Sequence, residues 1–225
     1  MHTMKQDKMT VFAIAIVAAA TTTMVVGQFV GVDSVGTVAK MTASSTFVAL
    51  ALGYGAHRTG YGRLLLAGFL LSWIGDLALA GTTERQFMLG LGSFLLAHLA
   101  YISAFLLFGV NRRWLLSALI PIALISLAVS IWLAPFVPVD LAIPVRVYTI
   151  IISLMVVAAF GARGRGASLV VPVGALLFYF SDLSVATGQF VQTDFPNYVW
   201  GLPFYFAGQV LLAISVREHS KLRRA

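Results

Sequence analysis

Two aspartates stand in apolar stretches of the sequence that contain no other charge. Asp76 lies in "GFLLSWIGDLALA", from Gly68 to Ala80, and Asp182 lies in "GALLFYFSDLSVA", from Gly174 to Ala186. A carboxylate that is removed from water is costly unless it has a partner. Two carboxylates in different surroundings can serve one reaction as proton donor and proton acceptor. The pair therefore predicts general acid–base chemistry in an apolar environment.

Further polar residues in the apolar stretches are candidates for the same site. Tyr205 and Gln209 are four positions apart, and His98 and Tyr101 are three apart, so each pair would share one face of a helix. Two of the candidates are bases, which are as rare as acids inside a membrane. The full set is Lys40, His98, Tyr101, Arg146, Tyr148, Ser181, Tyr205 and Gln209.

The composition is that of a membrane protein. The chain has 225 residues, of which 60% are hydrophobic and 10% are charged, whereas a soluble domain has roughly 25% charged residues. The absence of cysteine excludes a thiolate metal site and a cysteine nucleophile. The basic residues lie between apolar runs and not along one stripe, so we expect no nucleic-acid partner.

Apolar runs of about 17 to 25 residues can cross a bilayer as helices. The sequence has eight such runs, which predicts an all-α polytopic membrane protein, a single integral membrane domain over residues 1–225. A membrane barrel is not expected, because the runs lack the alternation of its strands. The expected spans lie near 10–30, 35–54, 64–81, 87–109, 114–134, 141–160, 168–190 and 198–216.

Lysine and arginine gather on one side of these spans. The opposite side carries Arg85 as its only base, together with Asp33, Glu84, Asp140 and Asp194. Because basic loops stay in the cytoplasm, we expect both termini there and the chain in the cell membrane. The basic side carries Lys5, Lys8, Arg58, Arg63, Arg112, Arg113, Arg163, Arg165, Arg217, Lys221, Arg223 and Arg224.

In this topology the intramembrane polar residues share one layer. Asp76 and Asp182 come shortly before the outer ends of their helices, and Lys40 comes shortly after the outer end of its own. His98 and Gln209 lie near the midplane, whereas the cytoplasmic halves of the spans are almost purely apolar. We therefore expect one cavity between the midplane and the outer leaflet.

The two aspartate stretches also align with each other. At an offset of 106 positions, the separation of Asp76 from Asp182, the residues Gly, Leu-Leu, Asp-Leu and Ala coincide, and Lys40 falls on Arg146. A shift of four helices preserves direction, so the alignment predicts two parallel-related four-helix halves, an arrangement known from other membrane folds.

Three other kinds of site fit these residues less well. A metal site is not expected, because His98 is the only histidine within a span. A Ser-His-Asp triad with Ser181 and His98 would lack the G-x-S-x-G elbow. The G-x-G-D signature of presenilin-type proteases is absent, since Trp73 stands two positions before Gly75. An acid–base pair of carboxylates remains.

A purely structural alternative is a network of buried ion pairs. Lys40 and Arg146 would each neutralise one aspartate, and the neighbouring hydroxyl, imidazole and amide groups would only close hydrogen bonds. Stability alone does not require so many costly polar groups in one layer, because buried ion pairs contribute little net stability. We therefore favour a functional site.

The order of four motifs resembles the YhhN family of membrane proteins, the lysoplasmalogenases. These motifs follow Lys40 and cover most of the chain, although Met41 stands where the family leads us to expect proline. They are "FLLSWIGDLAL", "GSFLLAHLAYISAF", "GALLFYFSDLSVA" and "FYFAGQVLLAIS".

The resemblance implies an enzyme without a cofactor that hydrolyses the vinyl ether bond of lysoplasmalogens, releasing a fatty aldehyde and glycerophosphoethanolamine or glycerophosphocholine. Its substrate would be a lyso-lipid or ether lipid of the bilayer. The family's functional residues fall here on Asp76, Asp182, His98, Tyr101, Ser181 and Gln209.

For this reaction we expect one aspartate to be the acid and the other the base, with His98 as a third catalytic group. Tyr205 and Gln209 would hold water, and Lys40 and Arg146 would suit a lipid phosphate. A proton-coupled transporter or lipid-handling protein could use the same aspartates, but it would need polar residues in the cytoplasmic half, where the sequence has almost none.

Overall fold

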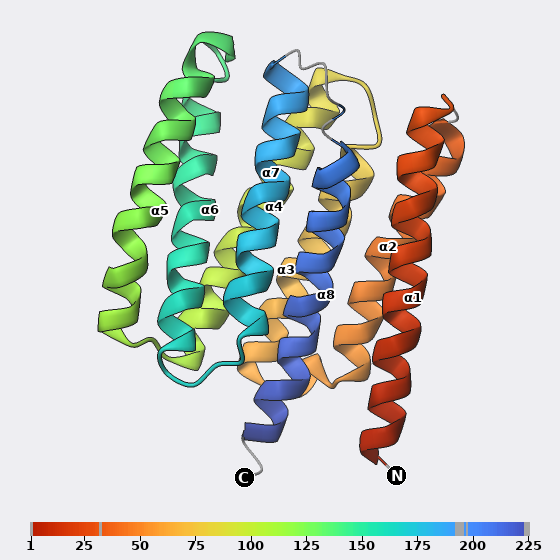
Figure 1. Ribbon diagram of the computed structural model, residues 1–225, viewed down its shortest axis with the longest axis vertical. Helices are drawn as coiled ribbons and strands as arrows, with labels where there is room; N and C mark the ends of the chain where they lie inside the picture. Colours follow the sequence, from red (N-terminus) through yellow and green to blue (C-terminus); the bar gives the residue numbers. More distant parts are fainter. Residues whose placement is uncertain (1, 32, 192–195, 197, 223–225) are drawn as a thin grey trace.

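Long helices cross the molecule from end to end and alternate in direction (Figure 1). The computed structural model describes residues 2–31, 33–191, 196 and 198–222, and these contain eight long helices, two short 3-10 helices and no strand. The long helices are α1 (His2–Phe29), α2 (Asp33–Gly53), α3 (Gly60–Ala78), α4 (Glu84–Phe108), α5 (Arg112–Leu133), α6 (Ala142–Arg163), α7 (Val170–Phe190) and α8 (Tyr198–Leu222), and the 3-10 helices are η1 (Ala56–Arg58) and η2 (Ala134–Phe136).

The predicted all-α architecture is confirmed, and each expected span corresponds to one long helix. The bounds differ at a few ends: α1 begins earlier than expected, α8 continues further, and α3 ends at Ala78. This early end places Asp76 in the last turn of its helix. Of the residues in the charge pattern, Asp194, Arg223 and Arg224 lie outside the described part of the chain.

Seven of the described helices are long and apolar enough to cross a membrane. The remaining one, α3, is 19 residues long and contains Arg63 and Asp76, which lower its mean hydropathy. Helix α3 packs against α2, α4 and α8, and its residues Phe69, Ser72 and Asp76 are buried. Helix α5 is the opposite case, with Ile120, Leu124 and Ile131 more than half exposed. The chain is a multi-pass membrane protein.

Polar side chains fix the beginnings of three helices. Thr83 and Gln86 form a reciprocal capping box at the start of α4, and Thr59 accepts a hydrogen bond from the backbone of α3. Asn111 Oδ1 accepts from the first backbone N–H groups of α5. Such caps satisfy N–H groups that have no partner within the helix.

The same helix contacts recur in the two halves of the chain. Helices α1 to α4 pack in consecutive pairs, and so do α5 to α8. Across the halves, α4 packs on α6 and α8 packs on α2, and these two contacts are equivalent if the halves exchange places. This pattern agrees with the predicted parallel repeat.

Matching glycines bring the helices close in both halves. A Cβ on Gly68 of α3 would lie 2.2 Å from the Tyr101 ring of α4. A Cβ on Gly174, which follows Gly68 by the repeat offset, would lie 3.0 Å from the carbonyl oxygen of Gly208 in α8. Small residues at such crossings let neighbouring backbones approach closely. The helices that carry the aspartates are therefore held tightly to α4 and α8.

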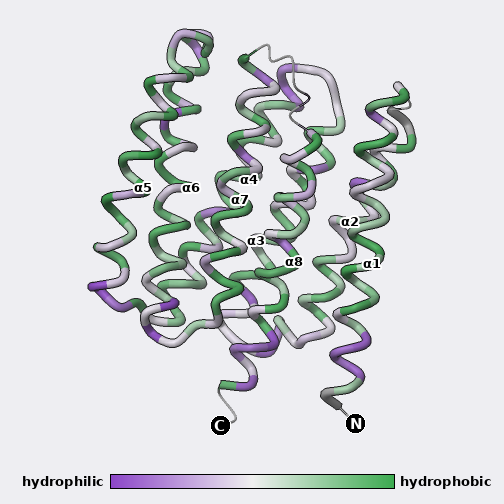
Figure 2. The backbone as a smooth tube through the Cα atoms, viewed as in Figure 1, coloured by the Kyte–Doolittle hydropathy of each residue, from purple (hydrophilic) through white to green (hydrophobic). Residues whose placement is uncertain are grey.

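Hydrophilic residues gather at one end of the bundle, where both termini lie, while the lengths of the helices are mainly hydrophobic (Figure 2). This end includes the basic connections that precede α3, α5 and α7. At the same end, Arg217 of α8 donates to Asp7 of α1 over 2.6 Å and ties the two terminal helices together.

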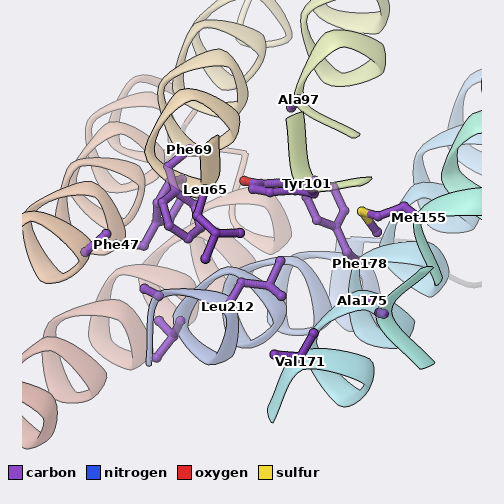
Figure 3. Close-up of a cluster of buried hydrophobic side chains, with 14 of the residues drawn as sticks. Phe47, Leu65, Phe69, Ala97, Tyr101, Met155, Val171, Ala175, Phe178 and Leu212 are labelled. Carbon is purple, nitrogen blue, oxygen red and sulfur yellow. The ribbon is translucent and has the colours of Figure 1, made fainter. Parts of the chain in front are cut away.

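Aromatic rings fill the centre of the bundle. Tyr101 of α4 lies between Phe69 of α3 and Phe178 of α7 (Figure 3), with ring centroids 5.6 Å and 6.1 Å away. Aromatic pairs at such separations, meeting edge to face, pack favourably. The core therefore joins α3, α4 and α7 directly beneath the two aspartates.

Candidate active site

A cavity of about 970 Å³ opens between the helices in the half of the bundle away from the basic end. Every long helix contributes to its wall, from Gln28 of α1 to Tyr205 of α8. Both Asp76 and Asp182 line it, together with Lys40, Tyr148 and Ser181. The cavity thus occupies the layer that the sequence predicted and contains both predicted acids.

Asp76 is held by two hydroxyl groups. Its Oδ2 accepts from Ser44 Oγ at 2.5 Å and from Tyr205 OH at 2.7 Å, and the residue is only 5% exposed. Lys40 lines the same cavity, and its charge acts on the Asp76 carboxylate. Hydrogen bonds to a carboxylate are stronger than those between neutral groups, so Asp76 is fixed in one orientation.

A chain of hydrogen bonds leads from Asp76 into the core. Gln209 Nε2 donates to Tyr205 OH at 3.3 Å, and Tyr101 OH donates to Gln209 Oε1 at 3.0 Å. Tyr101 and Gln209 are completely buried and are not part of the cavity wall. The structure therefore places these two predicted binding residues behind Tyr205, where they support the site without facing the cavity.

Asp182 is held by Tyr148 and His98. Tyr148 OH donates to Oδ2 at 2.5 Å, and His98 Nε2 lies 3.1 Å from the same oxygen. The His98 ring is fully buried and packs against Phe178, with centroids 4.8 Å apart. Its Nδ1 is buried without a hydrogen-bond partner among the described residues, so the ring interacts through Nε2.

Each aspartate is held by one side chain from its own half of the chain and by one from the other half. Each accepts from a hydroxyl on the helix before its own, Ser44 of α2 for Asp76 and Tyr148 of α6 for Asp182. Each also meets a side chain from the last helix of the other half. Tyr205 of α8 reaches Asp76 in the first half, whereas His98 of α4 reaches Asp182 in the second.

The predicted bases behave differently from each other. Lys40 lines the cavity, whereas Arg146 is exposed and is not part of the cavity wall. The residues that α6 presents to the cavity, such as Val145 and Tyr148, lie on another face. The structure therefore does not bring Arg146 to the site.

The ion-pair alternative is not what the structure shows. In the described part of the chain, the ion pairs join Asp182 to His98, Asp7 to Arg217 and Glu218 to Lys221. Neither Lys40 nor Arg146 forms an ion pair with an aspartate. The carboxylates are held by hydroxyl groups and an imidazole, which leaves the Lys40 ammonium available in the cavity.

Ser181 does not complete a triad. Its Oγ donates to the carbonyl oxygen of Phe178 at 2.7 Å and lies 3.4 Å from Asp182 Oδ1. His98 faces Asp182 and Tyr148 and makes no hydrogen bond to Ser181 among the described residues. No group of three potential metal ligands is found in the described residues either.

The sequence analysis missed Ser44, which makes a 2.5 Å contact to Asp76. Ser44 stands four positions after Lys40, so the two residues share one face of α2. That spacing was a usable signal, because the face that carries an inward base is also the face that can reach a carboxylate.

The site joins two carboxylates in unlike surroundings. Asp76 is almost inaccessible, whereas the Asp182 side chain is 14% exposed, and the charges of the two groups act on each other. Two interacting carboxylates of different environment are suited to hold one proton between them, as acid–base catalysis requires.

Comparison with known proteins identifies several relatives of this chain. A protein named lysoplasmalogenase from Mycobacterium bovis is 36% identical over 154 residues, which are 66% of this chain and 58% of that protein. Lysoplasmalogenase TMEM86B from Sus scrofa is 30% identical over 164 residues, 73% of this chain and 68% of that protein. Lysoplasmalogenase TMEM86A from Bos taurus is 31% identical over 160 residues, 68% of this chain and 65% of that protein.

The chain thus spans less than two thirds of the length of the mycobacterial relative. No solved structure matches it. The model of the YhhN family matches residues 35–216, a range that contains both aspartates, His98 and Lys40. The chain belongs to the YhhN family.

Proposed function

We propose that this protein is a lysoplasmalogenase, which hydrolyses the vinyl ether bond of a lysoplasmalogen to a fatty aldehyde and a glycerophospho-headgroup. The observation that carries the proposal is the pair of aspartates, each with its own hydrogen-bond partners, in one cavity within the membrane-spanning bundle. The names of its relatives support the same activity.

The reaction needs the groups that the cavity holds. A vinyl ether is activated when its carbon–carbon double bond accepts a proton, which creates an oxocarbenium ion that water then attacks. This chemistry requires a general acid, a base for the water and negative charge near the cation. Asp76 and Asp182 supply all three, and Tyr205 and Tyr148 orient them. His98, which is fully buried and outside the cavity wall, acts on the reaction through its contact with Asp182.

The proposal includes the setting of the reaction. The lyso-lipid would enter from the cell membrane, with both termini of the protein in the cytoplasm and the cavity in the outer leaflet. Lys40, the cation that lines the cavity, would meet the phosphate of the lipid. Ser181, Tyr101 and Gln209 would support the aspartates and their partners without touching substrate.

The test is aldehyde release by the purified protein in detergent. We expect aldehyde from a lysoplasmalogen and none from the saturated lyso-ether of the same chain and headgroup, because only the vinyl ether can be protonated at carbon. Inertness toward both lipids would overturn the proposal. If the protein also bound the intact lipids without turnover, a transporter would be favoured.

Two variants connect the activity to the site. Asp76→Asn and Asp182→Asn keep the side-chain volume and should each abolish aldehyde release while the protein is still obtained as a folded species. Asp140→Asn is the matched control, because Asp140 is an exposed residue at the cavity rim that meets neither aspartate in any hydrogen bond of the described residues. Full activity in either of the first two variants would refute the scheme.

A further inference from the structure

The cavity has a charged side and an apolar side. On the charged side, Lys40 of α2 and Gln28 of α1 contribute to the wall. On the opposite side, the wall is formed by the hairpin of α5 and α6, which lies at the far edge of the bundle from α1 and α2 (Figure 1). The cavity therefore changes from polar to apolar across the width of the protein.

The apolar wall is built from one face of each helix of the hairpin. Val129 and Leu133 are four positions apart on α5, and Val145 and Ile152 are seven apart on α6, the spacings of residues that share a helical face. Leu91 of α4 extends this wall. Such a surface suits a hydrocarbon chain. The hairpin also lines the cavity with two hydroxyl groups and one carboxylate: Tyr148 donates to Asp182, Thr149 donates to the carbonyl oxygen of Val145, and the charge of Asp140 at the rim would repel a phosphate.

The aspartates lie between these two sides, each nearer to one of them. Asp76 accepts from Ser44, which stands four positions after Lys40 on the same face of α2. Asp182 is held by Tyr148, which belongs to α6 and lies between Val145 and Ile152 along the apolar face. The order across the cavity is thus Lys40, Asp76, Asp182 and the hairpin.

We propose that the lyso-lipid binds across the cavity with its phosphate at Lys40 and its alkenyl chain against the α5–α6 hairpin. This inference rests on the proposed function and adds to it the direction of the substrate. The direction in turn assigns the aspartates. In a vinyl ether the carbon that accepts the proton is on the chain side, and the carbon that water attacks carries the ether oxygen on the headgroup side.

Asp182 is then the acid and Asp76 the base. The Asp182 carboxylic acid gives its proton to the chain-side carbon, whose new C–H bond is formed by the electrons of the double bond. Water attacks the oxocarbenium carbon and gives a proton to the Asp76 carboxylate, which leaves a hemiacetal. The hemiacetal hydroxyl returns a proton to Asp182, and Asp76 protonates the departing glycerol oxygen, so both groups regain their first state.

The contacts of each carboxylate fit this assignment. Asp182 Oδ2 is occupied by Tyr148 and His98, whereas the contact of Oδ1 among the described residues is the one from Ser181 at 3.4 Å. Oδ1 is therefore the oxygen placed to carry the transferable proton. Both carboxylates are held by neighbouring donors, so what distinguishes Asp76 is Lys40, which shares one face of α2 with the donor Ser44. A positive charge near Asp76 favours a carboxylate that can accept a proton from water.

The chain end of the proposal is tested with Val129→Trp, which fills the apolar side of the cavity. The assay measures kcat/KM for lysoplasmalogens that lengthen by two carbons at a time. In the unmodified protein each methylene that reaches the hairpin should raise kcat/KM about fourfold, equivalent to ~0.8 kcal/mol per buried CH₂. In Val129→Trp this rise should stop at a shorter chain, while the shortest substrates are unaffected.

Ile131→Trp is the matched control, because Ile131 lies on the same helix and is 65% exposed on its outer face. It should keep the chain-length profile of the unmodified protein. The ratio of variant to unmodified protein at each length cancels the partitioning of the lipid into detergent. If Val129→Trp leaves the dependence of kcat/KM on chain length unchanged, the proposed direction of the substrate is wrong.

The headgroup end is tested with Lys40→Met, which keeps the length of the side chain and removes its charge. Its kcat/KM should fall about tenfold or more further for lysoplasmenylethanolamine than for the alkenylglycerol that lacks the phosphate. Loss of the charge near Asp76 affects both lipids, whereas a charge-assisted contact to phosphate is lost only in the former. Lys40→Arg should recover part of the loss. Equal losses for both lipids, or a change in chain-length profile, would contradict the placement of the phosphate.

The assignment of the aspartates has its own test in heavy water. Asp76→Asn retains the acid, so it should protonate the double bond and release the proton again, and the recovered lipid should carry deuterium at the chain-side carbon. Asp182→Asn should give no exchange. Exchange in Asp182→Asn, or in neither variant, would overturn the assignment. If the unmodified protein releases no aldehyde from any of these lipids, the proposed function fails and not the direction alone.

Discussion

Removal of the Tyr205 hydroxyl is the most direct probe of how Asp76 is held. Tyr205→Phe keeps the ring, which packs on Phe178 at 5.2 Å between centroids, and deletes only the group that donates to Asp76 Oδ2. Ser44 would remain as the second donor. The variant should therefore fold like the unmodified protein, but Asp76, the proposed base, should be less firmly oriented.

The size of the effect follows from the kind of bond that is lost. A hydrogen bond to a charged group is worth about 1.5–3 kcal/mol, which corresponds to a loss of roughly 10- to 150-fold in kcat. Tyr101→Phe is the comparison, because Tyr101 reaches Asp76 only through Gln209 and Tyr205. Tyr101→Phe loses the bonds to Gln209 and Ser72, which join neutral groups, and only the bond to Gln209 leads towards Asp76. We therefore expect a loss in kcat of only about 2- to 12-fold.

The assay is aldehyde release under saturating lysoplasmalogen, with thermal unfolding of each variant measured in the same detergent. A double variant should lose little more than Tyr205→Phe alone, because both changes interrupt one chain of hydrogen bonds. An equal or larger effect of Tyr101→Phe, or losses that multiply in the double variant, would refute the idea that the core polar residues act through Tyr205.

Three further changes test other parts of the structure. Gly208→Ala places a Cβ 2.9 Å from the carbonyl oxygen of Gly174 and should destabilise the fold by about 1–3 kcal/mol, seen as a lower unfolding temperature, whereas Gly92→Ala, with nothing within 4 Å, should not. Arg146→Gln should leave kcat/KM unchanged, because Arg146 is exposed outside the cavity wall; a tenfold loss would contradict its placement. His98→Phe keeps an aromatic ring beside Phe178 and loses the contact to Asp182, so kcat should fall at least tenfold without loss of folded protein, as measured by aldehyde release and gel filtration.

The sequence was sufficient for the helices and for the depth of the site. Long apolar runs leave little choice of structure in a bilayer, because every backbone polar group must be satisfied within its own segment. The depth of Asp76, Asp182 and His98 followed from counting residues along helices of known rise. These inferences depend on position along a helix, which sequence records directly.

Rotation about the helix axis was harder to predict. One residue turns a helix by about 100°, and Arg146 is one residue from Val145, which lines the cavity. The repeat placed Arg146 on Lys40, but an alignment fitted to α3 and α7 does not fix the rotation of α2 and α6. For the same reason the sequence did not show which of three polar residues lines the cavity. The structure places Tyr205 in the cavity wall and Tyr101 and Gln209 behind it.

The exchange of partners between the halves has a consequence for the origin of the protein. A four-helix ancestor could not complete either aspartate alone, since Tyr205 and His98 each come from the opposite half. Such an ancestor would have worked as a homodimer in which the last helix of each subunit completed the site of the other subunit. Joining two copies in one gene freed them to diverge, so that Asp76 now accepts from Ser44 and Tyr205, whereas Asp182 is held by Tyr148 and His98. A chain cut in the connection between α4 and α5 should accordingly regain activity only when both pieces are made in the same cell.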